Sequence, residues 1–208
     1  MKHLPAVIVV LFMIPRIAVA QDTSSHTTAW IAPASGLTLA ATGTLFTFQP
    51  WLKSQAVNLR DVLQADGHHR LYFDDYVQYL PAALPPALNI CGLQSRHSLG
   101  KMALLEGGSY LLGFLVLKTV KQTIPVERPD RRNDESFPSG HTFMAFTGAE
   151  VLRREYGDRY PWIAAAGYAV AIVIGTMRLY NNRHWVGDVL AGAGLGMLAT
   201  SAVYFIFD

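Results

Sequence analysis

Long runs without a charged residue constrain this chain more than any other feature. Residues 160–177 and 189–207 contain no Asp, Glu, Lys or Arg over 18 and 19 positions. A helix that crosses a bilayer needs about 20 mostly apolar residues. Of all 208 residues, 51% are hydrophobic and 15% are charged, against about 25% charged in typical soluble domains. Because alternating strand patterns are not sustained, we predict an all-α, membrane-embedded bundle of four to six apolar helices.

Further apolar and polar stretches divide the rest of the chain. The segment 29–48 is uncharged and long enough to span, whereas 53–75 is polar and predicts a loop and an amphipathic helix. The segment 76–95 is uncharged too, but its prolines predict a kinked, re-entrant or partly inserted helix. Helices are also expected over 102–120 and 141–153. Small residues let helix backbones approach, so close packing of the last helix is predicted at Gly187, Gly192, Gly194 and Gly196.

Charge and cysteine content exclude several classes of protein. The net charge is only +2 and no basic run stands out, which does not suit a nucleic-acid binder. The single cysteine, Cys91, excludes an internal disulfide and a zinc site built on several cysteines. We interpret Cys91 as a small packed hydrophobe, because it lies in an apolar stretch. Asp74 and Asp75, which follow His68 and His69, come nearest to a metal cluster and are interpreted as a solvated loop.

The first 20 residues resemble a secretory signal peptide. A basic start is followed by a short apolar run at 4–14 and a small-residue cleavage pattern at 18–20. We predict cleavage after Ala20; the alternative is an uncleaved anchor, although the run is short for a span and Arg16 interrupts it. The predicted organisation is a signal peptide at 1–20, an N-terminal apolar and amphipathic region at 21–95, and a catalytic helical core at 96–208.

Three short motifs carry the candidate chemistry. They are Lys121 with Arg128-Pro129; Pro138-Ser139-Gly140-His141; and Arg178 with His184 and Asp188. A phosphoryl group in transfer carries spread negative charge, so its site needs fixed cations and amide donors. Lys121, Arg128 and Arg178 supply the cations, and the guanidinium fork suits phosphate oxygens. The alternative for Lys121 is a lysine that snorkels to the membrane surface.

The other two parts of such a site are an anion-binding helix start and a nucleophile. Ser139 is a favoured N-cap, and Gly140 lets backbone amides approach a ligand at the positive end of a helix. The spacing of His184 and Asp188 predicts that both lie on one helix face. A carboxylate there can hold one imidazole nitrogen and leave the other free as a nucleophile. An ordinary helix start and a plain surface His–Asp pair are the alternatives.

Together, the motifs resemble the signature of the type 2 phosphatidic acid phosphatase superfamily, which also includes class A acid phosphatases and vanadium haloperoxidases. That signature is K-x6-R-P, then P-S-G-H, then S-R-x5-H-x3-D, and the resemblance is close over 121–188. One position departs from it, because Met177 stands where the family has serine. A hydroxyl donor is therefore missing, and we expect a modest effect on phosphate contacts.

The resemblance implies a role for each motif residue. His184 attacks phosphorus and forms a phosphohistidine, Asp188 orients it, and His141 protonates the leaving oxygen and then activates water. The residues implied to hold the phosphate are Lys121, Arg128, Ser139, Gly140 and Arg178. The implied mechanism needs no metal, and no cofactor is predicted.

The motifs also predict an orientation in the membrane. All three lie at one membrane face if their helices span, and the opposite face holds Arg153, Arg154 and Arg159. Because positive residues favour the cytoplasm, the site is predicted to face away from it. If the site faces outwards, only one of the segments 29–48 and 76–95 can cross the membrane fully. This holds whether the signal is cleaved or retained as an anchor. The proline-interrupted segment is the better candidate for not spanning.

The leading hypothesis is a phosphatase of the bacterial inner membrane that acts at the periplasmic face. Its expected partners are the bilayer and a lipid phosphate or pyrophosphate: undecaprenyl pyrophosphate, phosphatidylglycerol phosphate, phosphatidic acid or a lipid A phosphate. The main alternative is a soluble periplasmic acid phosphatase of broad specificity, against which the uncharged runs argue. Small size argues against a haloperoxidase, and the complete His–His–Asp set argues against a non-catalytic scaffold. Arg131 and Arg132 could contact a large anionic head group or be solvated loop charges.

Overall fold

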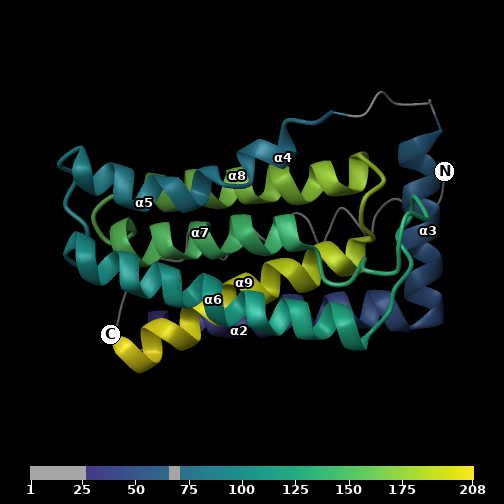
Figure 1. Cartoon of the computed structure of the whole chain (residues 1–208), viewed down its shortest axis with the longest axis horizontal. Coiled ribbons are helices and arrows are strands. Elements are labelled where there is room, and N and C mark those ends of the chain that lie inside the picture. Colours follow the sequence, from purple (N-terminus) through teal and green to yellow (C-terminus); the bar gives the residue numbers. More distant parts are fainter. Residues whose placement is uncertain (1–26, 66–70) are drawn as a thin grey trace.

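The computed structural model describes residues 27–65 and 71–208, and Figure 1 shows them as a bundle of roughly aligned helices. Within these ranges there is no strand apart from an isolated bridge between Val126 and Glu135, so the predicted all-α class is confirmed. The predicted signal peptide lies outside the described residues. The helices are α2 (Thr27–Phe48), α3 (Pro50–Gln64), α4 (Asp74–Val77), α5 (Leu80–Ile90), α6 (Leu99–Thr123), α7 (Gly140–Tyr156), α8 (Pro161–Tyr180) and α9 (Val186–Phe207).

Four of these helices, α2, α6, α8 and α9, are long and apolar enough to cross a membrane. This confirms the prediction of four to six apolar helices. Their outward faces are apolar as well: Leu104 and Leu111 of α6 are 77% and 62% exposed, and Trp162 of α8 is 66% exposed. Large apolar side chains on the outside of a bundle suit a hydrocarbon solvent rather than water. The shorter helix α7 packs among α6, α8 and α9 and is mostly buried.

Helix α9 lies along the middle of the bundle because its glycines admit neighbouring backbones. A Cβ at Gly194 would come within 3.0 Å of backbone atoms of Gly36 and Ala40 in α2, closer than real Cβ atoms approach. At Gly196, a Cβ would lie 2.8 Å from the carbonyl oxygen of Phe143 in α7. The predicted close packing of the last helix is therefore confirmed on two of its sides.

The proline-interrupted segment forms two helices instead of one. Helices α4 and α5 divide it, and α5 remains helical through Pro85 and Pro86. Residues 71–90 begin beside the end of α8, where the Leu71 amide donates to Asn181, and finish beside the end of α7. The carbonyl of Pro85 accepts a hydrogen bond of 2.7 Å from the Tyr156 hydroxyl. The sequence argument allowed only one of the segments 29–48 and 76–95 to cross the membrane. In the structure, both segments run along the bundle.

The two ends of the bundle differ. At one end, which we call the site end, α6 and α8 finish and α7 and α9 begin; α3 lies across this end (Figure 1). At the other, the far end, α7 finishes and α6 begins. The chain passes the far end just after Cys91, which is exposed. The interpretation of Cys91 as a packed hydrophobe is therefore wrong, because the residue caps the end of α5 instead of lying within a helix face.

Candidate active site

The fold brings all three sequence motifs together at the site end. The loop between α6 and α7 folds back so that the Ser139 amide donates to the carbonyl of Asp188 in α9 at 2.9 Å. The Lys121 ammonium, on the last turn of α6, donates to the carbonyl of Glu135 in the same loop at 2.5 Å. The Arg128 guanidinium reaches that same carbonyl at 3.5 Å. Two cations of the first motif therefore lie beside the helix start of the second and the carboxylate of the third.

The third motif is built differently from its predicted geometry. Helix α9 begins only at Val186, so His184 lies in the preceding turn and not on a helix face with Asp188. The Asp188 carboxylate instead caps the helix, because its Oδ2 accepts from the Trp185 amide at 2.8 Å. The Ser136 hydroxyl donates to the same oxygen at 2.5 Å. Asn182, at a φ of +55°, turns the chain out of α8 and towards His184.

His184 and Asp188 nevertheless form a close pair. Nδ1 of His184 lies 3.5 Å from Oδ2 of Asp188, and both side chains are almost wholly buried. That separation is an ion-pair contact but is long for a hydrogen bond. Burial lowers the pKa of His184 to about 4; the Asp188 carboxylate opposes this shift, and the charges of Arg128 and Arg178 add to it. The imidazole is therefore neutral at neutral pH, with Nε2 as the nitrogen turned away from Asp188.

The second motif forms the helix start that the sequence predicts. Ser139 is the N-cap of α7, and its hydroxyl accepts from the Thr142 amide and from the Thr142 hydroxyl at 3.0 Å. A Cβ at Gly140 would meet nothing within 4 Å, so open space adjoins the first residue of α7. Free amides at a helix N-terminus next to open space can bind an anion.

Three arginines each have a buried Nε donor that no protein group uses. Among the described residues, the Nε atoms of Arg128, Arg178 and Arg183 are buried without a hydrogen-bond partner. Buried polar atoms are normally paired, so such a set needs an explanation. The charges of Arg128 and Arg178 both act on His184. An anion with several oxygens beside His184 would satisfy donors of this kind.

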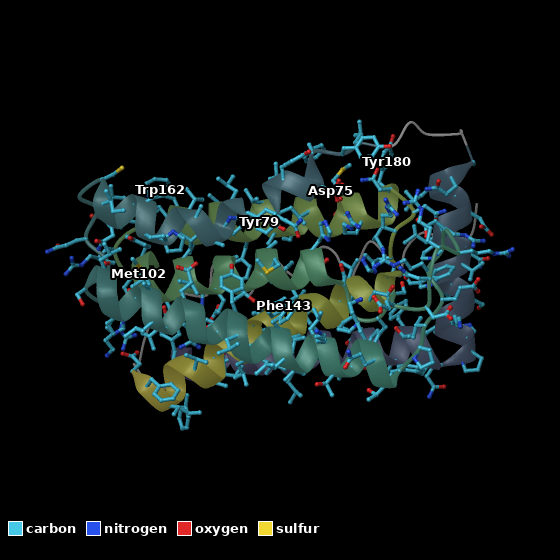
Figure 2. The ribbon with its side chains drawn as sticks, in the orientation of Figure 1. Asp75, Tyr79, Met102, Phe143, Trp162 and Tyr180 are labelled. Carbon is cyan, nitrogen blue, oxygen red and sulfur yellow. The ribbon has the colours of Figure 1, made fainter. Side chains whose placement is uncertain are left out.

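Two aspartates that precede the motifs also reach the site. The Arg178 guanidinium donates to Asp74 at 2.6 Å and to Asp75 at 3.1 Å. Nε2 of His141 lies 3.0 Å from the same Asp75 oxygen. The interpretation of this acidic pair as a solvated loop is wrong for Asp74, which is 1% exposed. Figure 2 shows Asp75 beside the C-terminal half of α8.

Comparison with known proteins identifies the family of the part of the chain that carries the three motifs. The sequence profile of the PAP2 superfamily matches residues 93–208, which include every residue of the three motifs. The chain belongs to the PAP2 superfamily. This is the type 2 phosphatidic acid phosphatase superfamily that the motifs resemble.

Relatives within the PAP2 superfamily include enzymes of lipid metabolism. The chain is 37% identical over 154 residues to a lipid A 1-phosphatase of Porphyromonas gingivalis, across 73% of this chain and 34% of that protein. It is 32% identical over 97 residues to the phosphatidylglycerophosphatase B of Bacillus subtilis, across 40% of this chain and 47% of that protein. It therefore spans about a third and about half of their lengths. The crystal structure of Aquifex aeolicus LpxE aligns with a TM-score of 0.56 and 25% identity, covering 72% of this chain and 94% of that one.

Sequence reasoning missed several residues that surround the PAP2 motifs. Ser136 holds Asp188, Asp74 and Asp75 hold Arg178, and Arg183 binds Asp130 at 3.0 Å while its Nε stays unpaired. Ser136 and Arg183 stand within three residues of a motif, so proximity was the available signal. The aspartates lie about a hundred positions from Arg178, and no local pattern pairs residues over that distance.

Proposed function

We propose that the chain is a membrane phosphatase that hydrolyses a lipid phosphate or pyrophosphate through a phosphohistidine at His184. One observation carries the proposal: a buried, neutral histidine paired with a carboxylate lies among buried arginine donors that have no protein acceptor. Donors fixed in a low-dielectric site stabilise the charge that develops on a transferring phosphoryl group. The helix start at Ser139 and Gly140 adds amide donors to the same site.

The proposed reaction has two steps. First, Nε2 of His184 attacks phosphorus, the bond from phosphorus to the leaving oxygen breaks, and His141 gives that oxygen a proton. Then His141 takes a proton from water, the resulting hydroxide attacks phosphorus, and the bond from phosphorus to His184 breaks. Asp188 stabilises the positive charge on His184 between the two steps. Lys121, Arg128 and Arg178 hold the phosphoryl oxygens throughout.

The surroundings of the site favour a lipid substrate over a soluble ester. Four helices are apolar enough to cross a membrane, and the site lies at the ends of three of them. Helix α3 lies across this end with Trp51 69% exposed and Val62 63% exposed. A helix with an apolar face and a position across the ends of spanning helices suits the membrane interface. The head group of a lipid would therefore reach His184 without leaving the bilayer.

We propose that the site faces the periplasm from the inner membrane. The arginines at the far end, Arg153, Arg154 and Arg159, favour the cytoplasm for that end. Since α2 runs antiparallel to α9, it begins at the far end, which would place Thr27 on the cytoplasmic side. A signal peptide cleaved after Ala20, or one retained as an anchor with its N-terminus inside, would place Thr27 outside. With both α2 and residues 71–90 crossing, either would turn the site inwards. The outward-facing site is therefore an alternative to both, and we propose it from Arg153, Arg154 and Arg159.

Phosphate release from a substrate panel tests the proposal. The purified protein in detergent would be given lipid A, undecaprenyl pyrophosphate, phosphatidic acid, phosphatidylglycerol phosphate and the soluble ester p-nitrophenyl phosphate. We expect release from at least one lipid, and loss of that release in His184→Ala but not in His97→Ala, which removes an imidazole at the far end. Lipid A is the first substrate to test, because the Porphyromonas relative is a lipid A 1-phosphatase. Release from the soluble ester alone would favour a broad-specificity acid phosphatase, and no release at all would refute the proposal.

A further inference from the structure

The imidazole of His141 has a carboxylate partner outside the three motifs. Nε2 of His141 lies 3.0 Å from Oδ1 of Asp75, and the side chains are 25% and 38% exposed. The same Asp75 oxygen accepts from the Arg178 guanidinium at 3.1 Å. Asp75 therefore joins the second motif to the third through a single oxygen atom, at the open side of the site.

The position of Asp75 is fixed by its neighbour in the sequence. Asp74 is 1% exposed and accepts from Arg178 at 2.6 Å with one oxygen and from the Asn181 amide at 3.0 Å with the other. Leu71 exchanges two backbone hydrogen bonds with the Asn181 side chain, at 3.0 and 2.7 Å. These contacts tie the chain before α4 to the end of α8. A half-exposed carboxylate held in this way loses little further entropy when it orients a partner.

We propose that Asp75 is the positioning residue of His141, in the way that Asp188 is the partner of His184. The inference rests on the proposed function. With Nε2 held by Asp75, Nδ1 is the nitrogen that His141 has for exchanging a proton with the leaving oxygen or with water. The carboxylate fixes that tautomer and stabilises the imidazolium that precedes proton donation. Asp75 itself gains and loses no proton in either step.

Asp75 favours the protonated form of His141 that this role needs. Burial and the charge of Arg178 lower the pKa of His141 to about 4, and the hydrogen bond and charge of Asp75, together with the charge of Asp74, oppose that shift. Although burial raises it, the pKa of Asp75 lies below its ordinary value because His141 hydrogen-bonds to the carboxylate and Arg178 is close. Asp75 is therefore ionised at neutral pH. Arg178 is held by Asp74 as well, so the loss of Asp75 leaves the guanidinium with a carboxylate partner.

The test compares two substrates whose leaving groups differ in how much they need a proton. Dodecyl phosphate releases an alcohol, which is a poor leaving group, whereas 4-dodecylphenyl phosphate releases a phenol, which leaves more easily as an anion. Proton donation by a positioned side chain contributes roughly 100-fold to 10,000-fold. We expect Asp75→Asn to lower kcat/KM for the alkyl ester about 10-fold to 100-fold, to lower it much less for the aryl ester, and to change KM little. Asp75→Glu should recover part of the loss, and Asp158→Asn, an exposed aspartate at the far end, should match the wild type.

A double-mutant cycle separates positioning from a structural role. If Asp75 acts through His141, Asp75→Asn should cause no further loss in a His141→Ala background. Equal losses on both esters, or additive losses in the cycle, would overturn the inference and leave the proposed function standing. If the wild type releases phosphate from neither ester nor from any lipid, the proposed function itself fails, and this inference fails with it.

Discussion

Replacing Gly192 with alanine should damage the site although Gly192 is not itself a motif residue. Gly192 lies on α9 against the backbone of Ser139, and a Cβ there would come closer than 3.0 Å to the Ser139 carbonyl oxygen. Ordinary van der Waals contact for a Cβ begins at 3.4 Å, and the neighbour is backbone that cannot rotate away. The start of α7 must therefore shift from α9 by a distance on the order of 1 Å, and a misplacement of that size can cost about 100-fold in rate. Overpacking of this kind also costs about 1–3 kcal/mol of stability.

The assay is phosphate release at saturating lipid, together with thermal unfolding in the same detergent. Gly107→Ala is the matched control, because a Cβ at this exposed position of α6 meets nothing within 4 Å. We expect the control to keep wild-type kcat, whereas Gly192→Ala loses roughly 100-fold while remaining folded. A folded Gly192→Ala protein with wild-type kcat would refute the argument that contact between α9 and Ser139 positions the anion-binding helix start.

Three further predictions concern the nucleophile, its partner and the orientation. His184 is neutral above its pKa of about 4, and protonation blocks its attack, so kcat/KM corrected for substrate ionisation should decrease when the pH is lowered past about 4. A decrease that begins near pH 6.5 would contradict the effect of burial on this pKa. Asp188→Asn should lower kcat by roughly 100-fold to 10,000-fold in a phosphate-release assay, since an amide at this position can favour the wrong tautomer; a loss under tenfold would count against the pair. Cys91 is the single cysteine and is exposed at the far end, so an impermeant maleimide should label it in inverted vesicles but not in spheroplasts, and the reverse pattern would place the site in the cytoplasm.

The apolar spans were predictable because the requirements of a bilayer are local in sequence. A run of 18 or 19 uncharged residues can satisfy its backbone in hydrocarbon only as a helix, and 160–177 and 189–207 became α8 and α9. The close packing at the glycines of α9 was predictable too, because small residues at helical spacing are visible in the sequence. The helix that continues through Pro85 was not predictable. It packs against Gly148 and Tyr156 of α7, which approach α5 only in the folded bundle.

The motifs identified which residues meet but not how they meet. Spacing alone placed His184 on a helix, whereas Asp188 caps α9 two residues beyond its start and leaves the histidine in a turn. A carboxylate four residues after a histidine is compatible with both arrangements, and the bonds from Ser136 and Trp185 decide between them. The pairing of Asp75 with His141 spans 66 positions, so only the tertiary structure brings it to light.

The covalent intermediate is the most direct test of the account. Wild-type protein and His141→Ala would be mixed with the aryl phosphate, quenched at alkaline pH where phosphohistidine survives, digested and examined by mass spectrometry. We predict a phosphoryl group on His184, accumulating to a higher level in His141→Ala because hydrolysis of the intermediate lacks its base. Phosphate on another residue, or turnover that persists in His184→Ala, would contradict the account.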